Sequence, residues 1–282
     1  MVLSMAAFSI EDMLIKAAAS TVPIGLILAL FGLGGMLIFT LLTWQRGEVI
    51  FHPEILSRPI LVRASCEVVG RLTFALAITL TPLSSASAIL QATPLVAVVG
   101  AALIFKEQIG VMRWFAILLG FVGVLVIIRP GLAGFEAASL FALIATLGFA
   151  GRDLATRGAP SVLSNMQLGV YGFFVLIPTG LGMLFYNSEP IQLDLVVIFQ
   201  IVGAIVFGVA AYYALTIAMR TGDVSVVSPF RYTRLLFALI WGGLVFSERP
   251  DMMTLLGGLL IIVSGSYTLI QSRRLLKINV AG

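Results

Sequence analysis

Ten apolar stretches, each close to the length of a membrane-spanning helix, fill almost all of this 282-residue chain. A helix needs roughly 20 predominantly apolar residues to cross the hydrocarbon core of a bilayer. Only 11% of the residues are charged, whereas soluble domains carry roughly 25%. The sequence therefore predicts an all-α integral membrane protein with ten transmembrane helices and no soluble domain. The predicted helices are Val2–Ala19, Val22–Trp44, Ile60–Leu80, Leu83–Phe105, Val111–Ile128, Ala137–Arg157, Met166–Tyr186, Leu193–Thr216, Val224–Phe246 and Met253–Ile270.

The chain repeats itself at an offset of 141 residues, which predicts two related halves, residues 1–130 and 131–282. In the clearest match Ser84 falls on Ser225 and Glu107 falls on Glu248. Each half holds five predicted helices, and an odd number gives the two halves opposite orientations in the bilayer. Such inverted repeats are typical of transporters, whose substrate site lies near the midplane between the halves.

Small and polar side chains form equivalent stripes on the fourth and ninth predicted helices. Each stripe lies on one face because steps of three and four residues bracket a helical turn. In lipid such a face turns toward protein or toward a water-filled cavity. We expect both stripes to bind substrate, although serines also permit close helix packing. The stripes consist of Ser84, Ser87 and Gln91, and of Ser225, Ser228 and Tyr232.

Several charged side chains fall at membrane depth, where each costs roughly 2.5–3.5 kcal/mol on insertion scales and marks a functional site by default. Three acid–base pairs are spaced four residues apart, so each could pair along one helix face. Either these pairs neutralise each other and fix helix packing, or they exchange partners during transport and bind the ends of a substrate. The pairs are Asp12 with Lys16, Glu67 with Arg71, and Asp153 with Arg157.

Two further arginines, Arg231 and Arg234, have no acid near them on their own predicted helix. Their partners must therefore lie on other helices, and the candidates are Glu11, Glu67 and Asp153. Arg231 flanks the polar stripe, whereas Arg234 points roughly to the opposite side. We expect Arg231 in the substrate cavity and Arg234 in a structural role.

Prolines lie inside the fourth and ninth predicted helices, at Pro94 and Pro229. Proline lacks an N–H donor and its ring displaces the carbonyl group four residues earlier, so each should kink its helix. Neighbouring groups or water must then satisfy the exposed carbonyl groups. The kinks serve either packing or gating.

The side chains that carry most enzyme chemistry are scarce. The chain has one histidine, His52 in a polar loop, and one cysteine, Cys66. An intramembrane serine protease or metalloprotease needs histidine as a base or as a ligand. A glycine-rich phosphate loop that ends in Lys-Ser or Lys-Thr is also absent from the sequence. We expect no enzyme activity, metal site or cofactor, and an intramembrane enzyme is the remote alternative.

The basic residues predict the orientation of the chain in the membrane. With both termini inside, eleven lysines and arginines lie at or near the cytoplasmic face and three at the outer face. The positive-inside rule therefore favours cytoplasmic termini. The net charge of +4 thus concerns orientation and not nucleic acid. The eleven are Arg46, Arg58, Arg63, Lys106, Arg113, Arg152, Arg157, Arg220, Arg273, Arg274 and Lys277, and the three are Lys16, Arg129 and Arg249.

Five segments of the sequence resemble the EamA family of the drug/metabolite transporter superfamily. In the first half these are Ala86–Glu107, Arg113–Val124 and the breaker Arg129-Pro130-Gly131, and in the second half Ser228–Tyr232 and Phe246–Glu248. The resemblance covers essentially the whole chain and implies ten helices in two inverted halves, a central cavity and alternating access without ATP. Members of this family include amino-acid exporters of the YddG kind, riboflavin permeases and importers of other metabolites.

These observations predict a secondary carrier of small organic metabolites in a bacterial inner membrane. A mixed interior of acids and arginines suits amphoteric substrates, so an amino-acid or metabolite exporter is the first expectation, with a proton as a candidate coupling ion. The alternatives are an importer of riboflavin or another metabolite, and a passive channel.

Overall fold

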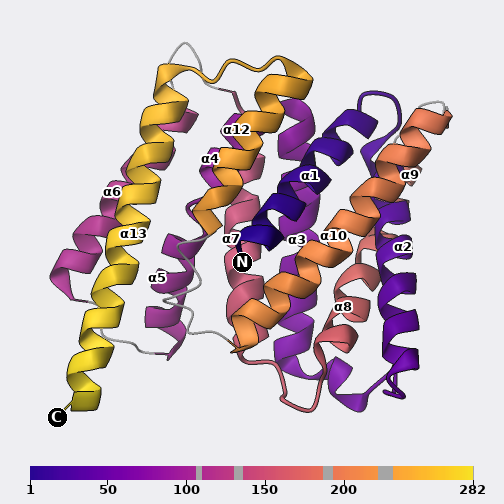
Figure 1. The fold of residues 1–282 in the computed structure, drawn as a ribbon, viewed down its shortest axis with the longest axis horizontal. Helices are drawn as coiled ribbons and strands as arrows, with labels where there is room; N and C mark the ends of the chain where they lie inside the picture. Colours follow the sequence, from indigo (N-terminus) through magenta and orange to yellow (C-terminus); the bar gives the residue numbers. More distant parts are fainter. Residues whose placement is uncertain (106–109, 130–135, 187–192, 222–230, 282) are drawn as a thin grey trace.

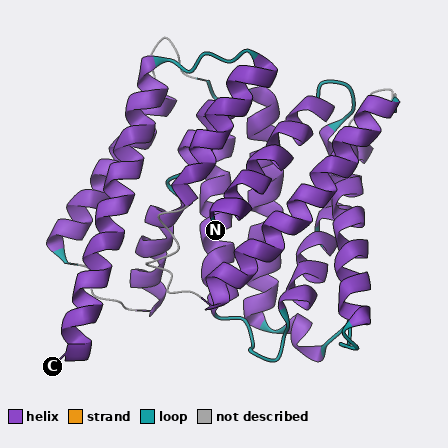
Figure 2. Ribbon diagram, viewed as in Figure 1, coloured by secondary structure: helices purple, strands orange, loops and turns teal. Residues whose placement is uncertain are grey.

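The described part of the chain is helical almost throughout (Figure 1 and Figure 2). The computed structural model describes residues 1–105, 110–129, 136–186, 193–221 and 231–281. These residues form ten helical spans, which confirms the predicted architecture of an all-α multi-pass membrane protein. The helices are α1 (Val2–Ala18), α2 (Ile24–Gln45), α3 (Arg58–Leu80), α4 (Leu83–Leu90) with α5 (Thr93–Phe105), α6 (Val111–Ile128), α7 (Ser139–Arg157), α8 (Asn165–Phe174) with α9 (Leu176–Tyr186), α10 (Leu195–Thr221), α12 (Thr233–Phe246) and α13 (Met252–Ala281), and a short turn, η1, covers Pro53–Leu56.

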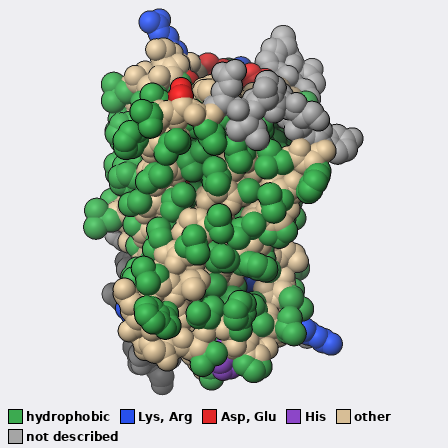
Figure 3. Space-filling model, turned by 90° about the vertical axis from the view of Figure 1, so that its right-hand side faces the viewer, with side chains coloured by type: hydrophobic (Ala, Val, Ile, Leu, Met, Phe, Trp, Pro, Cys, Tyr) green, Lys and Arg blue, Asp and Glu red, His purple; other side chains and the backbone are tan. Residues whose placement is uncertain are grey.

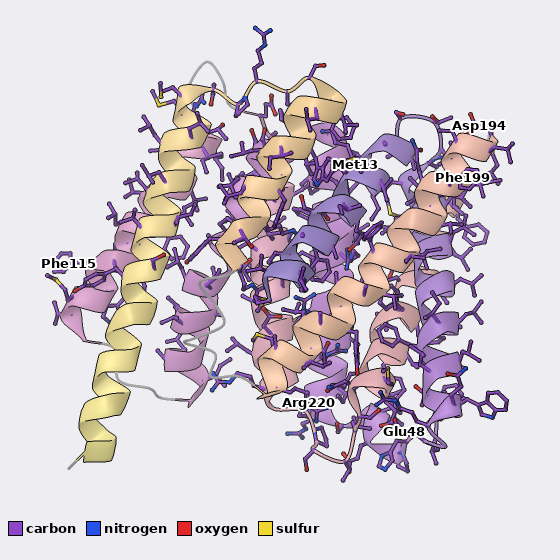
Figure 4. The ribbon with its side chains drawn as sticks, viewed as in Figure 1. Met13, Glu48, Phe115, Asp194, Phe199 and Arg220 are labelled. Carbon is purple, nitrogen blue, oxygen red and sulfur yellow. The ribbon has the colours of Figure 1, made fainter. Side chains whose placement is uncertain are left out.

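An apolar surface covers the outside of the bundle. Phe115 on α6 and Phe199 on α10 lie at its outer edges (Figure 4) and are 64% and 75% exposed. In the face shown by Figure 3, hydrophobic side chains cover the middle, and most of the visible charged ones lie near the two ends. Lipid tails solvate such a surface, and a helix is suited to lipid because it satisfies its own backbone hydrogen bonds.

Two spans are interrupted, and each interruption lies four residues before a proline. The fourth predicted helix divides after Leu90, and Pro94 stands in the first turn of α5, where its missing N–H breaks no helical hydrogen bond. Pro94 leaves the Leu90 carbonyl group without its helical donor, and the Thr93 hydroxyl donates to that group at 2.6 Å. The seventh predicted helix divides in the same way after Phe174, four residues before Pro178, where the sequence analysis expected a continuous helix. Pro229 lies outside the described residues.

Helices from residues 1–129 pack mainly against helices from residues 136–281, most closely at glycines. The contact between α3 and α7 is the most extensive. A Cβ atom on Gly148 of α7 would lie 2.6 Å from the Gly70 nitrogen and 2.7 Å from the Gly70 Cα on α3. The same close approach occurs between α6 and α13, where a Cβ on Gly257 would lie 2.5 Å from the Gly123 carbonyl oxygen. Small residues are typical of such interfaces in membranes.

Replacing Gly148 by leucine is expected to separate α3 from α7 and to destabilise the protein by about 3 kcal/mol. The atoms that the new side chain meets belong to the backbone, so a change of rotamer cannot relieve the clash. Thermal unfolding in detergent measures the effect. Gly182→Leu is the matched control because a Cβ there meets nothing within 4 Å. Equal melting temperatures for the two variants would contradict the packing described here.

Candidate functional site

Eight charged side chains from four helical segments meet in the interior of the bundle. None of them is more than 12% exposed. Four are acids and four are arginines, so their formal charges cancel. We call them the central cluster: Glu11 and Asp12 on α1, Glu67 and Arg71 on α3, Arg152 and Asp153 on α7, and Arg231 and Arg234 at the start of α12.

Most ion pairs of the central cluster join different helices. Arg71 on α3 pairs with Glu11 on α1. Asp12 accepts from Arg234 at 3.0 Å from Nε and at 2.6 Å from Nη2. The same-helix pairs Asp12–Lys16 and Glu67–Arg71, one of the two alternatives, are therefore not formed in this structure. Helical spacing shows which groups can pair along one helix, but closely packed helices offer nearer partners across the interface, where the arginine fork binds a carboxylate with good geometry.

A second set of pairs surrounds Asp153. Its Oδ1 accepts from Arg152 at 3.1 Å from Nε and at 2.9 Å from Nη2, and its Oδ2 accepts from Arg231. Arg152 also lies 3.5 Å from Glu67, measured from Nη1 to Oε2. Asp153, predicted as the partner of Arg157, thus bridges two other arginines. Asp153 was a candidate partner of Arg231, and this pairing is confirmed. Arg234 pairs with Asp12, which was not among its candidate partners.

Aromatic rings hold the guanidinium groups of the cluster in place. The Arg152 guanidinium lies 4.7 Å from the ring centre of Phe149, and that of Arg234 lies about 5 Å from Phe8 (5.0 Å) and Phe74 (5.1 Å). Desolvated cation–π contacts of this kind contribute about 2 kcal/mol each. No sequence pattern marked these phenylalanines, because apolar residues fill every helix of this chain.

A cavity of about 20 Å³ lies beside the central cluster. All four arginines of the cluster line it, together with Gln91 and the residues at the α4–α5 break, and none of the four acids is in the described part of its wall. This volume holds about one water molecule, whereas ligand pockets span roughly 300–1,000 Å³. A metabolite can enter only after the cavity has widened.

The predicted substrate-binding residues do not form one group. Arg71, Gln91 and Arg231 line the cavity, and Glu67 is buried behind Arg152. Arg234 also lines the cavity, so the expectation that it points away is wrong. Arg152, which was expected at or near the cytoplasmic face, is buried and lines the cavity. Its position beside Asp153, at membrane depth, was the signal that could have identified it.

The serine stripe of the fourth helix divides between two places. Ser84 lies at the end of the bundle and not at the cavity, and its hydroxyl donates to Glu248 at 2.9 Å. Ser87 Oγ and the Tyr232 hydroxyl are buried without a hydrogen-bond partner among the described residues. Tyr232 packs against Gly265 on α13. Ser225 and Ser228 lie outside the described residues.

Glu248 joins three helices at one end of the bundle. It accepts from the backbone nitrogens of Leu83 at 2.7 Å and of Ser84 at 3.0 Å, and it lies 3.2 Å from Lys16 Nζ. The carboxylate thus caps the N-terminus of α4, where the helix dipole favours an anion. Burial would raise the pKa of Glu248, but the Ser84 and Leu83 N–H groups and Lys16 outweigh it and hold that pKa below its usual value. We call these contacts the Glu248 clasp.

Replacing Glu248 by glutamine is expected to destabilise this end of the bundle by about 1–2 kcal/mol. The hydrogen bonds to Leu83 and Ser84 lose the charge of the carboxylate, and the partial exposure of the side chain keeps the loss small. Since the clasp lowers the pKa of Glu248, its stabilisation is present at neutral pH. It is lost as pH falls through that lowered pKa, below the ordinary value of 4.5.

Melting temperatures in detergent should therefore differ between wild type and Glu248→Gln at neutral pH and converge in acid. Glu136→Gln is the control, because Glu136 is exposed and lines the same 210 Å³ outer cavity as Glu248. A difference that persists unchanged in acid would show that the charge of Glu248 is not what holds the clasp.

A helical bundle with an apolar exterior, a buried charge cluster and a cavity between its helices has the architecture of a membrane transporter. The chain belongs to the EamA-like transporter family, which matches residues 1–129 and 137–270. A solved crystal structure shares this fold, with a TM-score of 0.66 over 95% of this chain and 98% of that chain, at 17% sequence identity.

The curated relatives of this chain are metabolite transporters of bacteria. A riboflavin transporter of Vibrio cholerae is 30% identical over 66% of this chain and 62% of its own length. An S-adenosylmethionine uptake transporter of Rickettsia prowazekii is 24% identical over 73% of this chain and 69% of its own. The pseudopaline exporter CntI of Pseudomonas aeruginosa is 25% identical over 93% of this chain and 92% of its own. Their names describe transporters and not enzymes, and they describe both directions of transport.

Proposed function

We propose that this protein is a secondary carrier that moves a small organic metabolite by alternating access, with the central cavity as its substrate site. The observation that supports this most directly is the cavity itself, which lies among α1, α3, the α4–α5 break, α7 and α12, from both matched segments. Charged groups that line a cavity inside lipid mark a substrate pathway. The two halves, residues 1–130 and 131–282, would rock about this site as inverted repeats.

The Glu248 clasp supports alternation between two states. Glu248 follows α12 and holds α1 and α4, so it joins residues of both proposed halves at one end of the bundle. A contracted central cavity, together with helices of both proposed halves joined at one end, is compatible with a state between inward and outward opening. Opening at that end requires the clasp to break. We propose that both termini lie in the cytoplasm, which the distribution of lysine and arginine supports.

The proposed substrates are amino acids and similar metabolites that carry a carboxylate. The arginines of the cavity wall would bind that group. Export is the direction we propose, because the pseudopaline exporter matches this chain over 93% of its length. Uptake of riboflavin or a related compound is the second candidate, which the Vibrio cholerae relative favours.

A proton is the proposed coupling ion. The central cluster balances four positive with four negative charges, so a substrate with a net negative charge, such as a carboxylate without an amine, would leave one negative charge without compensation. Uncompensated charge is costly in a medium of low dielectric constant. Uptake of a proton by one of the acids would restore neutrality.

Counterflow in proteoliposomes tests the carrier directly. Vesicles are loaded with an amino-acid panel or with riboflavin, and uptake of the labelled compound is followed with and without a pH gradient. We expect saturable counterflow of an amino acid or related carboxylate, and acceleration by the gradient. Counterflow of riboflavin alone would favour the second candidate. Uptake that is not saturable and shows no counterflow would indicate a channel.

A further inference from the structure

We infer that the central site recognises its substrate through an anionic group such as a carboxylate and not through an amine, and that Asp153 occupies the place of that group in this conformation. The inference rests on the proposed role of the cavity as the substrate site. It narrows the substrate class, because an amine is not required.

The charges of the cluster are sorted by sign around the cavity. The four arginines line it, and Arg231 is the most exposed at 12% of its side chain. Glu11, Asp12 and Glu67 are at most 1% exposed and lie behind the arginines that they neutralise. The described wall therefore offers charged donors to a substrate and no carboxylate. An ammonium group there would meet like charges, which disfavours its binding.

Asp153 shows how an anion is bound in this site. Its two oxygens divide between Arg152 and Arg231, which come from different helices. A substrate carboxylate has the same two oxygens and the same charge, so it can replace Asp153 at Arg231 without leaving that guanidinium unpaired. The Arg71 Nε–H is also buried without an acceptor among the described residues, so the wall holds a donor that an incoming anion can use.

The competing explanation is that the Arg231–Asp153 pair only fastens α12 to α7. The two explanations differ in what happens when Asp153 loses its charge. If Asp153 competes with substrate for Arg231, then Asp153→Asn removes the competitor and the affinity for anions rises. If the pair is only structural, anion affinity does not rise. The melting temperature does not separate the two explanations, because the loss of a buried carboxylate lowers it in both.

Ligand-induced thermal stabilisation of the purified protein in detergent provides the test. The probes are succinate, aspartate and putrescine, which share a four-carbon chain, together with aromatic and longer aliphatic monocarboxylates and their primary amides. We expect carboxylates to stabilise the protein whether or not they carry an amine, whereas putrescine and the amides of the acids do not. Equal stabilisation by an amide and its acid, or none by any carboxylate, would overturn the inference.

Arg231→Gln is expected to weaken carboxylate binding about tenfold or more, the loss of a charge-assisted contact worth about 1.4 kcal/mol or more. Arg46→Gln is the matched control, because Arg46 is exposed beyond the end of α2. Asp153→Asn should tighten binding several-fold, and this gain identifies competition even if Arg231→Gln proves unstable. Unchanged carboxylate affinity in both Arg231→Gln and Asp153→Asn would overturn the inference.

The inference and the proposed function can fail separately. Carboxylate binding without counterflow in proteoliposomes would refute the carrier and leave the anion site intact. Saturable counterflow of a compound without an anionic group would support the carrier and refute the anion site.

Discussion

Replacing Arg71 by glutamine is expected to abolish the accumulation of folded protein. Arg71 and Glu11 form a pair whose side chains are 4% and 0% exposed. Removal of one partner leaves an uncompensated buried charge, which costs about 3–5 kcal/mol. This is comparable with a large part of the total stability of a protein, roughly 5–15 kcal/mol. The yield of monodisperse protein on size-exclusion chromatography and its melting temperature measure the loss.

The double variant Glu11→Gln/Arg71→Gln should recover much of that loss, because both charges are then removed and two amides can hydrogen-bond to each other. Arg58→Gln is the matched control on the same helix, since Arg58 is exposed. A normal yield and melting temperature of the Arg71→Gln variant would mean that the folded protein tolerates Glu11 without its partner.

The conservative change Arg231→Lys is expected to reduce transport by about tenfold or more while the protein still folds. Lysine keeps the positive charge that Asp153 requires, so the interior stays neutral. It loses the planar fork that can bind both oxygens of a carboxylate, so the substrate carboxylate that replaces Asp153 would be held less tightly. Initial rates of counterflow, normalised to the amount of reconstituted protein, measure the change.

Arg234→Lys is the matched comparison. Arg234 also lines the cavity, but it binds one oxygen of Asp12 through both Nε and Nη2 and lies close to two phenylalanine rings. Lysine there loses one of these bonds, so the melting temperature should fall more than transport does. Normal transport by Arg231→Lys, together with inactive but folded Arg234→Lys, would place the substrate at Arg234.

The ten spans could be predicted from sequence because lipid imposes one requirement, roughly 20 apolar residues, on each of them. The presence of charges at membrane depth also identified most members of the cluster, including Asp153 as a candidate partner for Arg231. What could not be predicted is which helix lies beside which. The pairing of Asp12 with Arg234, 222 residues away, depends on how α1 packs against α12, and spacing along α1 contains no information about it.

Two further differences between the predicted and the observed structure have local causes. Arg152 stands near the C-terminal end of a predicted helix, so sequence position suggested the membrane face, but the structure places it against Glu67 of α3 and in the wall of the cavity. The interruption after Phe174 follows from Pro178 by the same steric rule that applies at Pro94, and it was missed because the apolar run continues through it.

In the proposed mechanism, the cavity beside the cluster is reached from each side of the membrane in turn and holds the substrate. Thiol labelling tests this most directly, with Gln91→Cys introduced at the cavity in a Cys66→Ala background. Membrane-impermeant reagents are applied from one side or the other, with and without the compound that shows counterflow. We predict labelling from both sides and protection by that compound. A thiol that is never labelled, or one that is labelled at the same rate under saturating substrate, would contradict this account.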